Sequence, residues 1–429
     1  MEKIAIIGGG ITGLTIAKKL CKKYDVTIIE KDIKLGGIAS SFNCDGVILD
    51  KYYHHIFKSD NYILDLCKEL NIYEEIEWLD SKMGYLSNSK MYEFGTAISL
   101  LKFKPLNIID KVKFGIGILA IKFIKNGMKL ENITAREWLI KKSGIKVYEC
   151  IWEPLLKTKF GSKDKDISMA WMWGKIKLRG SSKEKGQEKL GYMKGSFGKL
   201  VECLEKYLKD NDVKIYTNTE VANINKKDKQ YVLEVNNEKV HFDKVISTVA
   251  YPILTEITKE IFSKEYMDKL NAVQYTSTRC MIMVLNKSFM PFYWLNIGDA
   301  NIPFGGLIEH TNLVNMKLNI IYISNYMYSN DKLYNCTDEE LLEEYIKHLI
   351  KINKNFTRED IKKYYVFKDK YAQPVIEKNY SKIMPTFETE QENMYIAAMP
   401  QIYPEDRGIN YAVKLGNEIS KIVLTNKGN

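Results

Sequence analysis

A glycine-rich turn near the start of the chain limits the possible fold more than any other feature. Residues 3–7 form a short apolar run that predicts a buried parallel strand, and Gly8-Gly9-Gly10-Ile11-Thr12-Gly13 follows it directly. Residues 14–24 then have the spacing of an amphipathic helix, and residues 26–29 predict a second strand. This order predicts a β-α-β unit that binds a dinucleotide.

Each part of the turn has its own physical task. Gly8 permits the tight turn, Gly10 lets the backbone approach a pyrophosphate, and Gly13 lets the helix pack closely on the strand. The N-terminus of the helix faces the phosphates, so we expect Ile11 and Thr12 to belong to the cofactor site as well.

An acidic residue, Glu30, closes the second predicted strand. A carboxylate at this position accepts hydrogen bonds from an adenosine ribose and repels a 2'-phosphate, so we expect an unphosphorylated nucleotide. A second glycine pair, Gly36-Gly37, lies just beyond it, where a plain NAD-dependent dehydrogenase continues into an ordinary crossover.

Glu30 followed by Gly36-Gly37 resembles the FAD fingerprint of the flavoprotein superfamily that contains amine oxidases, protoporphyrinogen oxidases, phytoene desaturases and UDP-galactopyranose mutases. In that family the second glycine pair packs on the FAD pyrophosphate and ribityl chain. Many members carry Arg directly after the pair, whereas this chain has Ile38, so backbone amides or another residue must meet the pyrophosphate charge. The resemblance adds five positions to the expected FAD site: Lys31, Gly36, Gly37, Ile38 and Ala39.

The run Asp-Lys-Tyr-Tyr-His-His-Ile-Phe at residues 50–57 resembles the family segment that lies under the isoalloxazine ring, and His-Ile-Phe is similar to the mutase branch. The alternative is a polar loop with a structural role. The resemblance implies that Tyr53 and His54 contact FAD. His55, with an ordinary pKa of about 6.5, is our candidate for accepting or releasing a proton.

Two later segments resemble further parts of the family's FAD domain. Residues 213–224, 230–235 and 244–249 predict strands around a hairpin, and the residue that matches Val221 meets the adenine through its backbone. Residues 394–399 predict a buried strand, followed by a loop and a helix from residue 411.

The resemblance implies that the N-terminus of the C-terminal helix points at the flavin C2 carbonyl. The negative charge on this carbonyl grows when the flavin is reduced. The resemblance therefore adds Gly408, Ile409 and Asn410 to the FAD site. Arg407, just before this helix, is a candidate catalytic residue that stabilises reduced flavin or holds an anionic substrate. No cysteine lies within residues 372–428, where monoamine-type amine oxidases attach FAD through sulfur, so non-covalent FAD is implied.

These segments predict an α/β, Rossmann-like FAD-binding domain assembled from residues 1–90, 190–250 and 365–429. Residues 91–189 and 251–364 then form an α+β lobe that binds the substrate, with the flavin in the cleft between the two. No second Gly-x-Gly-x-x-Gly follows a strand, so a dedicated NAD(P)H domain is not expected.

Charge and cysteine usage exclude several classes of protein. The net charge is +10, but it is spread along the chain and comes almost entirely from lysine, since the chain has five arginines, so we expect no nucleic-acid partner. Seven scattered cysteines without zinc spacing predict no metal site and reduced thiols. The N-terminus lacks the parts of a signal peptide, which favours a cytoplasmic protein. The oligomeric state is not predicted.

Residues 99–130 alternate apolar clusters with lysines. Two interpretations compete: helices that roof the active site, which we favour, and an interfacial surface that lies on anionic lipid.

Residues 152–161 and 168–179 combine three of the six tryptophans with several cations. Aromatic side chains beside cations suit a ring that carries an anionic group, and ordinary packing is the alternative. Lys175 and Arg179 are the candidate substrate contacts.

We favour an FAD-dependent oxidoreductase that transfers a hydride from a small-molecule substrate to flavin N5. The substrate is expected to be anionic or a sugar nucleotide. The main alternative is a UDP-galactopyranose mutase-like flavoenzyme that acts on a nucleotide sugar without net redox. A third class is a flavoprotein that binds or assembles without turnover.

Overall fold

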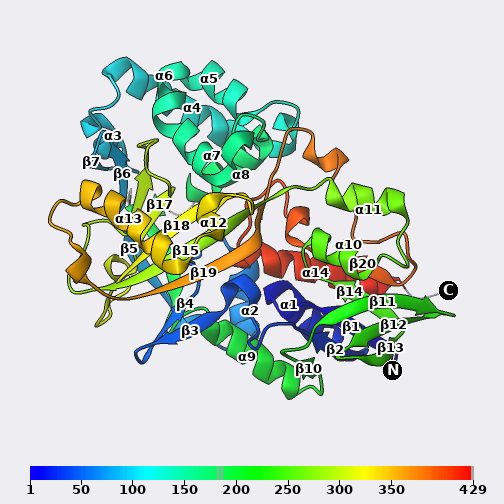
Figure 1. Cartoon of the computed structure of the whole chain (residues 1–429). Helices are drawn as coiled ribbons and strands as arrows, with labels where there is room; N and C mark the ends of the chain where they lie inside the picture. Colours follow the sequence, from blue (N-terminus) through cyan, green and yellow to red (C-terminus); the bar gives the residue numbers. More distant parts are fainter. Residues whose placement is uncertain (181–182, 185–186, 427–429) are drawn as a thin grey trace.

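The computed structural model describes residues 1–180, 183–184 and 187–426 (Figure 1). A five-stranded parallel sheet with strand order β10-β2-β1-β14-β20 lies near both termini. Its strands are β1 (Lys3–Ile7), β2 (Asp25–Ile29), β10 (Lys214–Tyr216), β14 (Lys244–Ser247) and β20 (Met394–Ile396). The sheet is therefore built from the beginning, middle and end of the chain.

The two faces of this sheet are covered by different layers. Successive residues of β1 alternate between them: Ile4 and Ile6 pack into a helical layer, whereas Ala5 and Ile7 pack towards a three-stranded antiparallel sheet. The helices are α1 (Ile11–Leu20), α2 (Asn61–Glu69), α9 (Gly198–Lys209) and α14 (Ile409–Thr425). The antiparallel strands are β11 (Val221–Lys227), β12 (Gln230–Val235) and β13 (Glu238–Phe242). This confirms the predicted α/β, Rossmann-like class.

A seven-stranded sheet with strand order β19-β15-β18-β17-β16-β6-β7 forms the centre of the other half. Its strands are β6 (Met83–Ser87), β7 (Lys90–Glu93), β15 (Tyr275–Leu285), β16 (Trp294–Ile297), β17 (Gly306–Glu309), β18 (Asn319–Met327) and β19 (Ile361–Pro374). Helix α13 (Asp338–Ile352) packs apolar side chains against one face of this sheet.

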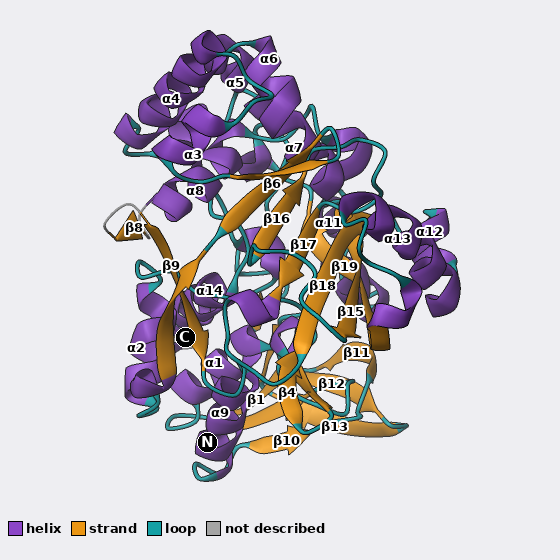
Figure 2. Cartoon of the chain, turned by 90° about the vertical axis from the view of Figure 1, so that its left-hand side faces the viewer, coloured by secondary structure: helices purple, strands orange, loops and turns teal. Residues whose placement is uncertain are grey.

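A group of helices spanning residues 97–180, here called the helical cap, lies at the end of the molecule opposite the parallel sheet (Figures 1 and 2). Its helices are α3 (Ala97–Lys102), α4 (Ile108–Phe123), α5 (Ala135–Ser143), α6 (Ile145–Val147), α7 (Glu153–Phe160) and α8 (Met169–Gly180). Its core combines aliphatic and aromatic side chains and includes Trp138, Trp152 and Trp171.

The remaining elements are short connections and hairpins. They are β3 (Ser41–Cys44), β4 (Val47–Asp50), β5 (Ile76–Ser81), β8 (Lys183–Glu184), β9 (Gln187–Met193), α10 (Tyr251–Ile257), α11 (Lys264–Asn271) and α12 (Lys332–Asn335).

No helix of the described part is long and apolar enough to cross a membrane. The predicted segments 91–189 and 365–429 include residues 181–182, 185–186 and 427–429, which lie outside the described residues.

The predicted strands at residues 244–249 and 394–399 are shorter in the structure, and three further predicted elements change. Helix α1 covers Ile11–Leu20 rather than residues 14–24, because extended Gly10 caps it and a turn leads into β2. Residues 213–224 are not one strand: Asn218, at φ 51°, lies in the break between β10 and β11, which belong to different sheets. Helix α14 begins at Ile409, two residues before the predicted start.

Candidate active site

The glycine turn after β1 is closed on one side and open on the other. Gly8 has φ +106°, and a Cβ on Gly13 would lie 2.1 Å from the Gly8 carbonyl oxygen, so α1 packs directly on the turn. A Cβ on Gly10 would meet no atom within 4 Å. The backbone at Gly10 and the N-terminus of α1 therefore border open space, as a pyrophosphate site requires.

The second glycine pair packs against the first. The Gly36 amide donates to the Gly9 carbonyl oxygen at 2.8 Å, and Gly10 and Gly36 form an isolated parallel bridge. Gly36 and Gly37 have φ +107° and +56°, which other residues adopt at a cost. Two distant turns thus form one backbone-lined cradle, next to which lie Ile38 and Ala39.

The Glu30 carboxylate holds the cradle in place through hydrogen bonds to backbone amides. It is 6% exposed; one oxygen accepts from the Gly9 amide at 2.6 Å and the other from the Asp32 amide at 2.8 Å. Each carboxylate oxygen keeps a lone pair for a further donor, such as a ribose hydroxyl. The Thr219 amide donates to the Glu30 carbonyl oxygen, so the segment leading into Val221 lies beside it.

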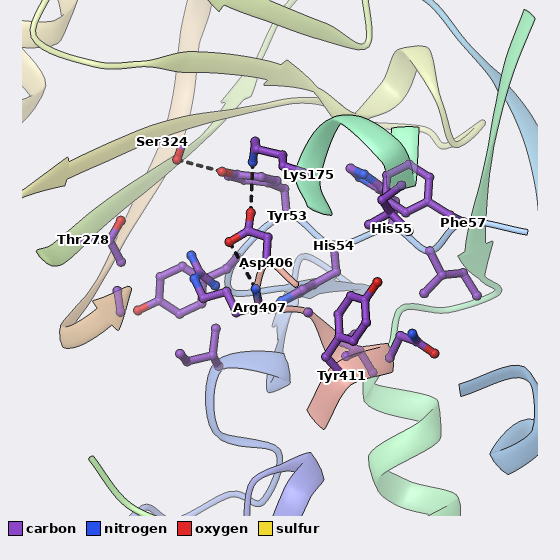
Figure 3. Close-up of a pocket in the computed structure, with 18 of the residues that line it drawn as sticks. Tyr53, His54, His55, Phe57, Lys175, Thr278, Ser324, Asp406, Arg407 and Tyr411 are labelled. Carbon is purple, nitrogen blue, oxygen red and sulfur yellow. Dashed lines mark hydrogen bonds and ion pairs between the residues drawn. The ribbon is translucent and has the colours of Figure 1, made fainter. Parts of the chain in front are cut away.

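A cavity of about 180 Å³ lies where the helical cap, the seven-stranded sheet and the start of α14 meet (Figure 3). It brings together ten of the residues singled out in the sequence: Ile38, Tyr53, His54, His55, Lys175, Arg179, Arg407, Gly408, Ile409 and Asn410. The others do not line it; Gly8, Gly10, Gly13, Glu30 and Val221 belong to the cradle side.

An aspartate with two lysine partners, not singled out in the sequence, lies at the centre of the cavity wall. Asp406 accepts from Lys159 Nζ at 2.9 Å, from Lys175 Nζ at 3.0 Å and from Trp171 Nε1 at 3.2 Å (Figure 3 shows the Lys175 contact). Burial alone would raise the pKa of Asp406, but Lys159, Lys175 and Arg407 hold that pKa well below its usual range. Asp406 is therefore ionised. In the sequence, the only feature that marks Asp406 as a candidate site residue is its position beside Arg407.

Two arginines present their guanidinium groups to the same cavity. Arg407 Nε donates to Gln373 Oε1 at 2.9 Å, and its Nη2 donates to the Tyr326 hydroxyl. Arg179 lies 5.5 Å from the centre of the Trp294 ring. Among the described residues neither guanidinium has a carboxylate within ion-pair distance, so both cations are available to an anion.

Both histidines of the 50–57 segment line the cavity and are neutral. Burial and then Arg407 lower the pKa of His54 to about 4, while burial and then Arg179 lower the pKa of His55 to about 3. The Tyr293 hydroxyl lies 3.3 Å from His55 Nδ1. Buried His54 Nδ1 has no hydrogen-bond partner among the described residues.

These features fit FAD. The cradle offers backbone amides to a pyrophosphate, and Glu30 offers a carboxylate to a ribose. Ile409 and Asn410, at the start of α14, line the cavity, and their amides have no acceptor within the helix. The cradle and the cavity meet at Ile38, as one extended dinucleotide requires.

Comparisons with known proteins agree with this assignment. Residues 11–384 match the family model described as flavin containing amine oxidoreductase. Coproporphyrinogen III oxidase of Staphylococcus aureus is 25% identical over 286 residues, which cover 59% of this chain and 61% of that protein. The 15-cis-phytoene desaturase of Synechococcus elongatus is 27% identical over 158 residues, 33% of each chain. The chain thus matches less than two thirds of the length of these relatives.

Solved structures show the same fold over the full length. A putative protoporphyrinogen oxidase from Exiguobacterium sp. 255-15 matches with a TM-score of 0.80 and 17% identity, covering 99% of each chain. Reduced UDP-galactopyranose mutase matches with a TM-score of 0.76 and 16% identity, covering 100% of this chain and 97% of the other. Because the family model spans most of the sequence, the chain belongs to the flavin-containing amine oxidoreductase family, and its cofactor is FAD.

Proposed function

We propose that the protein is an FAD-dependent oxidoreductase that takes a hydride from an anionic small molecule held in the cavity beside His55, Lys175, Arg179 and Arg407. Bound FAD supplies a two-electron acceptor for a C–H bond held close to it. The observation that supports an anionic substrate is the pair of arginines without carboxylate partners, both lining one cavity.

We assign FAD binding to residues 1–90, 190–250 and 365–429 and substrate binding to residues 91–189 and 251–364. The FAD contacts that we propose are Gly8, Gly10, Ile11, Thr12, Gly13, Glu30, Lys31, Gly36, Gly37, Ile38, Ala39, Tyr53, His54, Val221, Gly408, Ile409 and Asn410. We keep the expectation that attachment is non-covalent, since no cysteine lies within residues 372–428.

Arg407 and His55 have different proposed tasks. Arg407 is oriented by Gln373 and Tyr326, so its positive charge is directed at one place in the cavity. Neutral His55 is in the form that accepts a proton, but the cations beside it make its protonated form costly. We therefore expect His55 to take a proton only when a bound anion offsets those cations.

Flavin absorbance provides the test. Under anaerobic conditions the purified protein is mixed with a panel of amines, isoprenoid acids, porphyrinogens and nucleotide sugars, and bleaching of the flavin identifies a reducing substrate. Arg179→Gln should weaken binding of an anionic substrate about tenfold to a hundredfold, as expected for a lost charged hydrogen bond. Arg358→Gln removes the same charge from an exposed site and should have no effect. Equal binding by both variants contradicts the anionic-substrate assignment.

A second candidate is isomerisation of a nucleotide sugar without net redox. The Arg179–Trp294 contact favours it, because an aromatic ring beside a cation suits a base linked to a phosphate. Product analysis separates the two functions: a mutase converts a nucleotide sugar with dithionite-reduced enzyme and consumes no oxidant. Absence of both turnover and flavin bleaching across the panel favours a non-catalytic flavoprotein.

A further inference from the structure

Helices α3 and α4 carry an unusual concentration of exposed apolar side chains. Each is between 53% and 82% exposed, and together they make up half of the exposed large apolar residues of the described chain. We call this group the α3–α4 apolar surface: Ile98, Leu101, Ile108, Ile109, Val112, Ile116, Leu119 and Phe123. A soluble monomer rarely leaves such a contiguous patch to water.

The exposed apolar residues of α4 form one regular face of the helix. The exposed residues from Ile108 to Phe123 recur at helical spacing and share an arc of roughly 100° on the helix. The opposite face is firmly packed: Ile121 is fully buried, and a Cβ on Gly117 would lie 2.1 Å from Ser143 Oγ. One face of α4 therefore holds it to the cap, and its second apolar face has no partner among the described residues.

Another surface helix of this chain shows the usual pattern. Helix α13 buries an apolar face that includes Leu341 and Tyr345 and turns glutamates and lysines outward. The outward side of α4 lacks such a polar covering. The contrast indicates that the exposed face of α4 meets something other than water.

The charges around the surface are almost all positive. Residues 97–130 contain seven lysines and a single acidic residue, Asp110, which is buried. By helical position Lys111 and Lys122 flank one edge of the α4 face and Lys113 the other. None of the seven lysines forms an ion pair within the described part of the chain.

We propose that the α3–α4 apolar surface binds the surface of a bilayer that contains anionic phospholipids. The apolar side chains enter the boundary between head groups and acyl chains, while the lysines extend to the lipid phosphates. The protein rests on the bilayer and does not cross it, since α4 has 16 residues and a span needs about 20. A second copy is the less suitable partner, because it would bring lysines against lysines.

Vesicle flotation tests the proposal with the FAD-loaded full chain. Wild-type protein should float with vesicles of phosphatidylcholine and phosphatidylglycerol, and at least tenfold less with phosphatidylcholine alone; added salt should weaken binding. The double variant Ile116→Glu/Phe123→Glu should lose binding to anionic vesicles at least tenfold. Its flavin content and melting temperature should match wild type, because both side chains are already exposed. Ile350→Glu, on α13, is the matched control and should float normally.

Three outcomes would overturn the proposal. The first is wild-type protein that stays with the unbound fraction on anionic vesicles. The second is a double variant that floats like wild type while the flavin content of both is the same. The third is self-association of wild-type protein that the double variant abolishes, without vesicle binding, which would assign the surface to a second copy.

Discussion

The two ends of the proposed FAD site are built in different ways. The cradle end is made of backbone: two glycine turns, brought together by the Gly36–Gly9 hydrogen bond and by Glu30. The cavity end is made of charged side chains that meet from distant segments, such as Lys159 and Asp406, which are 247 residues apart. A site lined by backbone requires glycines at fixed spacing, so it can be recognised in a short stretch of sequence. A charge cluster joins residues from distant segments, so it can be recognised only in the folded chain.

The strongest test of the cradle compares two of its glycines. Gly13→Ala places a methyl group 2.1 Å from a backbone oxygen, so we expect a loss of about 3 kcal/mol or more of stability and no bound flavin. Gly10→Ala has open space and φ −72°, so the fold should persist while FAD affinity falls. Urea unfolding and flavin absorbance measure both effects. Wild-type FAD affinity in Gly10→Ala would show that the pyrophosphate lies elsewhere.

The corresponding test of the cavity end is Asp406→Asn. This substitution leaves Lys159 and Lys175 without their shared carboxylate, and breaking a buried ion pair costs about 3 to 5 kcal/mol. Lys175→Met keeps the pair between Asp406 and Lys159, whose side chains are each 13% exposed, and should cost clearly less. Denaturant midpoints of the two variants check this order. If both variants unfold at the wild-type midpoint, Asp406 does not hold the cavity wall together.

Asp50 is buried between the segment leading into α9 and strand β18 of the seven-stranded sheet, and its titration should be visible in stability. Its carboxylate accepts from the Tyr192 hydroxyl and the Phe197 amide, and the Tyr322 hydroxyl of β18 donates to its carbonyl oxygen. Burial raises its pKa from 3.8 to about 7, so between these values the folded state keeps a proton that the unfolded state has released. Stability should therefore fall as pH rises from about 4 to about 7, by on the order of 4 kcal/mol from this group.

Asp50→Asn removes this proton uptake. The variant should lose that part of the pH dependence while keeping the Tyr192 contact. Urea unfolding of the FAD-loaded proteins at several pH values measures the difference, and parallel pH profiles of variant and wild type would contradict the assignment.

The smallest predicted effect concerns the geometry of Arg407. Lys at this position keeps the charge but lacks the planar guanidinium whose Nε and Nη2 are fixed by Gln373 and Tyr326, so we expect turnover to fall about a hundredfold with normal flavin content. Anaerobic reduction rates measure it. Turnover at the wild-type rate in both Arg407→Lys and Arg407→Ala would remove Arg407 from the proposed catalytic residues.

Much of the parallel sheet could be predicted from the sequence, because the β1-turn-α1-β2 unit is local and its apolar runs are continuous. The break between β10 and β11 could not, since a single Asn, although it tolerates the left-handed conformation, is a weak turn signal within a strand-like run, and the two strands pair with different partners. In the site, the candidates near glycine turns were identifiable from spacing. Lys159 and Asp406 were missed, because each is an ordinary charged residue until burial and pairing change its pKa.

The amino-acid sequence by itself determined the dinucleotide turn, because glycine conformation and strand-helix spacing act over a few residues. Tertiary structure alone decided which charges share the cavity, since those contacts join segments separated by most of the chain. Tertiary structure also decided which apolar residues of α4 are exposed. The sequence shows apolar residues mixed with lysines, and only the packing of α4 against the rest of the cap determines which apolar side chains face outward.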